Sequence, residues 1–162
     1  MSDVPVSAVT IPRVAAHPSG VGGWLLVFVI SFSVVSPAFM IGNSLRLLSA
    51  AASLHRTSVV AVYQFAGWSE ILIGLLFVAV GMLIVCRKRQ AKAAVPLVLA
   101  FCTLWGITLW SLFVFLPADA PVRALWEERM MFPMLQRFVY AVLWGSYWMH
   151  STRVANTFAE EA

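Results

Sequence analysis

Four long apolar stretches constrain the fold of this chain more than any other feature of its sequence. They cover residues 22–41, 67–86, 94–116 and 132–149. Each is close to the ~20 residues that a helix needs to cross the hydrocarbon layer of a membrane. The chain is 61% hydrophobic and 11% charged, which is more apolar surface than a soluble globule of 162 residues can hide from water. The sequence therefore predicts an all-α membrane protein, a four-transmembrane-helix bundle that forms a single integral-membrane domain over residues 1–162.

The first apolar stretch has one feature of a cleaved secretory signal, because the small residues "SAAAS" follow it at 49–53. The segment before it, however, is long and weakly charged, and the stretch is longer than the apolar part of a signal peptide. We therefore expect a retained helix. Pro37 inside it should bend or loosen that helix.

The short segment between the second and third stretches is strongly basic. It holds Arg87, Lys88, Arg89 and Lys92. Lysine and arginine collect in loops that stay on the cytoplasmic side of a membrane, so this segment is predicted to be cytoplasmic. With four spans, both termini then face the cytoplasm too. The same rule accounts for the net charge of +4 without a nucleic-acid partner, and none is expected.

The segment between the third and fourth stretches, 117–133, predicts a short amphipathic helix. Apolar residues recur in it at helical spacing, namely Val122, Leu125, Trp126 and Met130. Such a helix is expected to lie along the membrane interface. Trp24, Trp126 and Trp148 are expected at head-group depth, where amphipathic rings settle.

Two ionisable residues interrupt the apolar stretches, Glu70 in the second and Arg137 in the fourth. A charge inside a bilayer is costly, so such residues usually face other helices and find a partner. The two should lie at similar depth on parallel helices, which predicts an intramembrane ion pair. Three interpretations stay open: the pair fixes helix register, Glu70 accepts a proton or a cation, or each group reaches interfacial water.

Small residues follow the same faces as these charges. Gly67, Gly74 and Gly81 recur every seven residues, which keeps them on one face together with Glu70. On the fourth stretch, Ala141 and Gly145 follow Arg137 at intervals of four residues. Small residues let neighbouring helices approach closely, so both faces are predicted to be helix-packing faces.

Sequence motifs of known chemistry do not occur. The chain has no GxSxG, HExxH or phosphate-binding glycine loop, and its three histidines are not spaced to ligate haem within one chain. Cys86 and Cys102 are expected at different depths as free thiols. No catalytic residue, metal or cofactor is therefore predicted, and the chain is expected not to be an enzyme.

The two ends of the apolar region carry a family resemblance. The opening "GVGGWLL", 20–26, and the closing "LWGSYWMHSTRVANTF", 143–158, are similar to those of the YdgK-like domain-of-unknown-function family of small four-span bacterial inner-membrane proteins. The closing motif matches at Trp144, Tyr147, Ser151, Arg153, Val154, Thr157 and Phe158. The resemblance implies a bacterial inner (cytoplasmic) membrane location and no activity.

Several functions are compatible with these features. The first is a non-enzymatic accessory or scaffold subunit of a larger membrane complex, with the lipid bilayer and other membrane subunits as partners. The alternatives are a small oligomeric proton-coupled transporter that uses Glu70, or a quinone-associated or redox-associated membrane subunit. Val154 and Phe158 are four residues apart, so a continued helix would present both as an apolar contact point for lipid or a partner.

Overall fold

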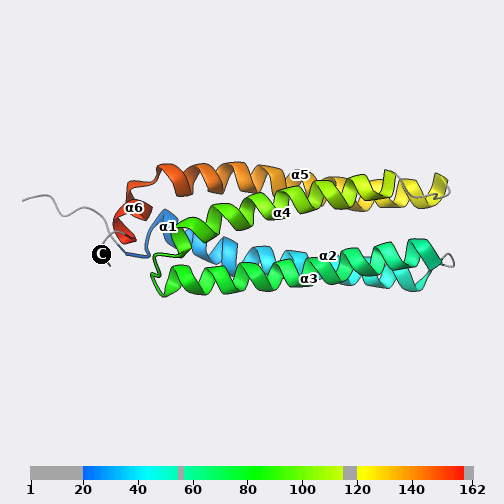
Figure 1. Cartoon of the computed structure of the whole chain (residues 1–162), viewed down its shortest axis with the longest axis horizontal. Coiled ribbons are helices and arrows are strands. Elements are labelled where there is room, and N and C mark those ends of the chain that lie inside the picture. The colour runs from blue at the N-terminus through cyan, green and yellow to red at the C-terminus, as the bar shows by residue number, and fades with distance from the viewer. Residues whose placement is uncertain (1–19, 55–56, 115–119, 159–162) are drawn as a thin grey trace, which may run out of the picture.

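The computed structural model describes residues 20–54, 57–114 and 120–158, and these residues are almost entirely helical. They form one short helix and four long helical rods that lie side by side (Figure 1). The elements are α1 (Trp24–Ile30), η1 (Ser31–Val35), α2 (Ser36–Ala52), α3 (Thr57–Val85), α4 (Ala91–Val114), α5 (Ala120–His150) and α6 (Thr152–Thr157). Successive rods run in opposite directions, so α3 and α5 are parallel.

Elements α1, η1 and α2 form the first rod, which is continuous from Trp24 to Ala52. The middle part, η1, is a π-helical turn, and the backbone N–H of Ser36 bonds to the carbonyl of Ser31. Pro37 follows directly and is buried. A proline has no N–H to donate and its ring crowds the preceding turn, so a wider turn just before it keeps the helix unbroken. The expected loosening at Pro37 thus takes the form of one π-turn.

The prediction of an all-α membrane fold is confirmed in outline. Within the described residues, three helices are long and apolar enough to cross a membrane: Trp24–Ala52, Val59–Val85 and Ala91–Leu112. These helices differ in extent from the predicted spans, since α3 begins at Thr57 and α2 ends at Ala52. Helix α5 is longer but carries several charged residues, and its crossing of the membrane stays a prediction.

The prediction of a separate interfacial helix between the third and fourth spans is wrong. Helix α5 runs without a break from Ala120 to His150, with Pro133 inside it. Its first turns pack onto the protein itself, because Trp126 and Met130 are buried in a cluster with Tyr63. The side chains of Val122 and Leu125 lie outside the described residues. Because Trp126 packs into the protein, the helix continues straight toward His150 instead of turning along the membrane interface.

The rods are arranged as two hairpins. The first rod packs most extensively on α3, and α4 packs on α5. Two buried apolar clusters hold them, one toward the α6 end with Phe28, Phe77 and Leu99, and one toward the far end with Leu47 and Trp126. The outer surface is apolar along its length, as lipid requires; its large exposed side chains include Trp24, Trp68, Leu97, Leu104 and Phe132.

Candidate functional site

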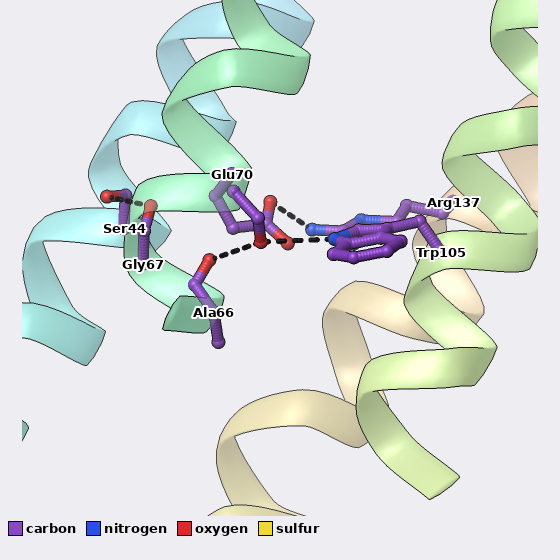
Figure 2. A network of polar contacts seen from close by, with 7 residues as sticks. Ser44, Ala66, Gly67, Glu70, Trp105 and Arg137 are labelled. Carbon is purple, nitrogen blue, oxygen red and sulfur yellow. Dashed lines mark hydrogen bonds and ion pairs between the residues drawn. The ribbon is translucent and has the colours of Figure 1, made fainter. Parts of the chain in front are cut away.

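A buried ion pair joins the two hairpins (Figure 2). The Nη2 atom of Arg137 on α5 donates a hydrogen bond to Oε2 of Glu70 on α3. The side chain of Glu70 is 0% exposed and that of Arg137 is 11% exposed. The structure thus brings together the two ionisable residues that interrupt the predicted second and fourth spans. Because both charges lie out of water, each depends on the other for its burial.

Gly106 of α4 lets Arg137 reach its partner. A Cβ atom built on Gly106 would lie 3.3 Å from Nη1 and 3.4 Å from Cδ of Arg137. The guanidinium therefore crosses α4 where that helix has no side chain. Sequence reasoning missed Gly106, because a lone glycine within an apolar stretch has no spacing that ties it to a charge on another helix.

Further polar contacts surround the pair and form a layer between the two apolar clusters (Figure 2). The indole N–H of Trp105 donates to Oγ of Ser69 over 3.1 Å, and Ser69 donates to the carbonyl of Ala66 over 2.8 Å. On the other side of α3, Oγ of Ser44 donates to the carbonyl of Gly67 over 2.7 Å. These bonds tie α2, α3 and α4 together at the level of Glu70.

The glycines of α3 pack against the first rod rather than against α5. A Cβ on Gly67 would lie 2.8 Å from Cγ of Leu48, and a Cβ on Gly81 would lie 2.0 Å from Oγ of Ser33. At Gly74 the nearest atoms, in Pro37 and Met40, are at 3.7 Å. The contact between α3 and the first rod is therefore closest at Gly67 and Gly81, and it is an ordinary van der Waals contact at Gly74.

The small residues of α5 do not form an equally close contact. A Cβ on Gly145 would find its nearest neighbour, Cδ1 of Leu99, at 3.9 Å. Ala141 instead lines a cavity of about 50 Å³ beside Arg137 and Tyr140. This cavity is large enough for a few water molecules.

A larger groove lies between α2 and α5. It measures about 860 Å³ and shares Phe39, Asn43 and Pro133 with the cavity beside Arg137. The two hollows therefore adjoin, and together they lead from the far end of the molecule toward the ion pair. Within the described part of the chain, Oε1 of Glu70 and Nδ2 of Asn43 are buried without a hydrogen-bond partner.

The C-terminal motif folds back onto the start of the first rod, in a contact that we call the terminal clasp (residues 20–23 with α6). The chain turns at Ser151, whose Oγ caps α6 by accepting from the N–H of Val154 at 3.4 Å. This brings Thr157 to Gly20, whose N–H donates to Oγ1 of Thr157 over 3.1 Å. Arg153 lies over Gly23, where a Cβ would come within 2.6 Å of Nη1. The two motifs that carry the family resemblance are therefore in contact.

The expectation that Val154 and Phe158 form an exposed contact point is wrong. Val154 is 1% and Phe158 4% exposed, and both belong to the apolar cluster at this end. The reason is the turn at Ser151, which directs α6 across the end of the rods instead of continuing α5. Arg153 lies against the glycines of the clasp.

Aromatic rings fill the space beneath the clasp. Phe28 lies 5.2 Å from Trp144 and 5.1 Å from Trp148, measured between ring centroids, and Trp148 lies 5.5 Å from Phe158. Tyr147 stacks edge-on against Trp144. Trp148 is 3% exposed, so it is a core residue and not part of an aromatic belt. Trp24, at 71% exposed, remains free to contact head groups.

Thr157→Val is expected to loosen the clasp. The change keeps the shape of the side chain but removes the oxygen that accepts from Gly20, a loss worth about 1 kcal/mol. Hydrogen exchange measured on the peptide that contains Gly20 should then speed up by about fivefold. The exposed Thr152 of the same helix gives the control, since Thr152→Val should leave that exchange unchanged. Equal exchange in all three proteins would contradict the clasp.

The basic loop lies beside the clasp. Arg87, Lys88 and Arg89 are exposed between α3 and α4, and Lys92 is exposed in the first turn of α4. Arg87 has a positive φ of 54°, and its Nη2 would lie 3.3 Å from a Cβ on Gly20. The carbonyl of Lys92 accepts from the indole N–H of Trp148 over 3.1 Å. The loop thus shares one end of the molecule with the described start and end of the chain.

The chain was compared with protein families, curated proteins and solved structures. The family model described as "Protein of unknown function (DUF2569)" matches residues 18–159. No curated protein and no solved structure matches the chain. The match agrees with the resemblance to an uncharacterised family, while the YdgK name and a bacterial origin stay predictions.

Proposed function

This chain belongs to the DUF2569 family of unknown function, and from that premise we propose that it is a non-enzymatic accessory or scaffold subunit of a larger membrane complex. The three apolar helices found among its described residues indicate a membrane protein. We place it, as part of the proposal, in the inner membrane of a bacterium, with the basic loop and both termini in the cytoplasm. The exposed cations of that loop support this orientation.

The proposal includes a fourth span formed by α5. From Met131 onward, most of the large exposed side chains of this helix are apolar: Met131, Phe132, Leu135, Phe138, Val139, Val142, Leu143 and Met149. The exposed polar ones among the described residues are Gln136 and, at the end of the helix, His150. Its one charge in this part, Arg137, points inward to Glu70. A helix with an apolar outer face and a neutralised inner charge is compatible with lipid.

Cysteine labelling tests this topology. In a background with Cys86→Ser, a membrane-impermeant maleimide added to intact cells should label Glu127→Cys. It should label Ala155→Cys and Arg89→Cys only after the cells are opened. All three positions are exposed, so access through the membrane decides the result. Labelling of both Glu127→Cys and Ala155→Cys in intact cells would rule out a crossing by α5.

The observation that carries the accessory role is the closure of one end of the molecule. The groove and cavity lead toward the ion pair from the far end, whereas the aromatic rings and the clasp fill the α6 end. Among the described residues, the polar layer is used to hold the hairpins together. A hollow that opens at one end suits a protein that binds another molecule rather than a channel or carrier that passes a solute through the membrane.

Native purification tests the accessory role. Extraction in a mild detergent, followed by affinity purification of the full chain, should recover it with larger membrane proteins. The recovery should be lost in a harsh detergent that separates membrane complexes. Recovery of a clean monomer from native membranes in the mild detergent would overturn the proposal.

A proton-coupled carrier is the second candidate, favoured by the hollows that reach the ion pair. Phe39, Asn43 and Pro133 line both hollows, and the inner one is bounded by Arg137. Purified protein in liposomes should then carry a proton current that Glu70→Gln abolishes. Glu127→Gln, at an exposed position outside both hollows, should keep the current. Equal currents in the two variants would exclude Glu70 as the titrating group.

A further inference from the structure

The groove between α2 and α5 is polar at one end and apolar at the other. At the far end its lining includes Arg46, Ser49, Glu128 and Arg129. Nη1 of Arg129 donates to the carbonyl of Arg46 over 3.1 Å, which places both arginines at one level. Toward the middle of the molecule the lining is apolar, with Val34, Val35, Ala38, Phe39 and Phe132. A hollow with this gradient matches an amphiphile.

We propose that the groove is a binding site for a single phospholipid of the surrounding bilayer. Its phosphate lies between Arg46 and Arg129, and one acyl chain runs along the apolar floor between α2 and α5. Guanidinium groups bind phosphate oxygens through charge-assisted hydrogen bonds, often two at a time. This inference goes beyond the accessory role and holds whether or not a partner protein is found.

The dimensions of the groove agree with one leaflet. Arg46 and Val34 are twelve residues apart on the first rod, which corresponds to about 18 Å at ~1.5 Å per residue. Half of a ~30 Å hydrocarbon core is ~15 Å. An acyl chain whose phosphate lies at Arg46 would therefore pass the polar layer, which Ser44 marks two residues from Arg46, and extend to about the end of the groove.

The charge of the rim favours a phosphate over a neutral head group. Two arginines and one carboxylate, that of Glu128, line it, which leaves a net charge of +1. A transmembrane helix of a partner is the other conceivable occupant of an apolar groove. The backbone of such a helix is uncharged and would leave Arg46 and Arg129 without an anionic partner. A phospholipid supplies that partner with its phosphate, so it fits the rim better.

Gly42 offers a way to fill the groove without disturbing the fold. It belongs to the lining, and a Cβ built on it meets nothing within 4 Å. Gly42→Phe should therefore place a ring in the hollow. Leu45→Phe is the matched control, because Leu45 is 60% exposed on the same helix and lies outside the groove.

The test is native mass spectrometry of the full chain, purified in mild detergent and titrated with phosphatidylglycerol. The wild type and Leu45→Phe should each retain one lipid, whereas Gly42→Phe should lower its retention at least about tenfold. The pair Arg46→Gln and Arg129→Gln should do the same by removing the phosphate ligands, since a charge-assisted bond supplies about this factor. Arg123→Gln, at an exposed position on α5 outside the groove, is the control for lost charge.

Three outcomes would overturn the proposal. Equal lipid retention in Gly42→Phe and the wild type would show that lipid binds elsewhere. Equal retention of phosphatidylglycerol and an uncharged diacylglycerol would remove the arginines from recognition. A protein that co-purifies with the wild type, is lost from Gly42→Phe and displaces the lipid would make the groove a helix-docking site.

Discussion

Replacing Arg137 with glutamine is expected to lower the free energy of unfolding by about 3–5 kcal/mol. The change leaves the carboxylate of Glu70, which is 0% exposed, without its opposite charge. Oε1 of that carboxylate has no hydrogen-bond partner among the described residues, so the bond from Arg137 to Oε2 is the contact that compensates its charge there. Glu70→Gln should also destabilise the protein, since it leaves the guanidinium buried beside Gly106. Unfolding by a denaturing detergent in mixed micelles, followed by tryptophan fluorescence, measures both effects.

The double change separates a specific pair from two independent losses. Glu70→Gln with Arg137→Gln removes both charges, so its cost should be smaller than the sum of the single costs by about 2 kcal/mol. Arg123→Gln and Glu127→Gln are the controls, because both residues are exposed on α5 and should change stability by less than ~0.5 kcal/mol. Additive effects of the two single changes would mean that the pair is not energetically coupled.

Gly81→Ala is expected to be the most damaging single methyl addition on α3, costing about 2–3 kcal/mol. The new Cβ would lie 2.0 Å from Oγ, 2.6 Å from Cβ and 3.3 Å from Cα of Ser33. A rotation of the Ser33 side chain can move Oγ but not Cβ, so the two helices must separate. Thermal unfolding of the purified protein in detergent should report the loss as a lower midpoint.

Other glycines supply matched controls for this effect. Gly74→Ala, on the same face, would meet its nearest atoms at 3.7 Å, and Gly42→Ala would meet none within 4 Å. Both should be neutral or should stabilise the protein by up to about 1 kcal/mol through helix propensity. Ser33→Gly in the Gly81→Ala protein should restore stability by removing the clashing atoms. Equal midpoints for Gly81→Ala and Gly74→Ala would contradict the close contact at η1.

The parts of this structure that the sequence could predict rest on local periodicity. Apolar runs of about 20 residues identify membrane helices, because lipid imposes their length directly. The spacing of the glycines on α3 points to a helix-packing face. The isolation of Glu70 and Arg137 among apolar residues points to an ion pair. Each of these patterns either lies within one helix or involves a single partner residue on another helix.

The features that the sequence could not predict depend on contacts between distant segments. Helix α5 is continuous because Trp126 packs against Tyr63 of another helix, at 4.9 Å between ring centroids. Phe158 is buried because Ser151 turns the chain back onto α1, and a helical pattern alone would have continued outward. Gly106 matters only because Arg137 crosses it. In each case the deciding neighbour lies on another helix.

The clasp has a consequence for the order in which the protein is made. Gly20 and Thr157 are 137 residues apart, so their hydrogen bond cannot form until nearly all of the described chain has left the ribosome. Contacts between such distant residues form late and slowly, because a long loop must close first. Until then the aromatic rings beneath α6 have no cover from Phe158. Newly inserted protein should therefore pass through an open stage in which this end is exposed to proteases and chaperones, and that stage ends when Thr157 reaches Gly20.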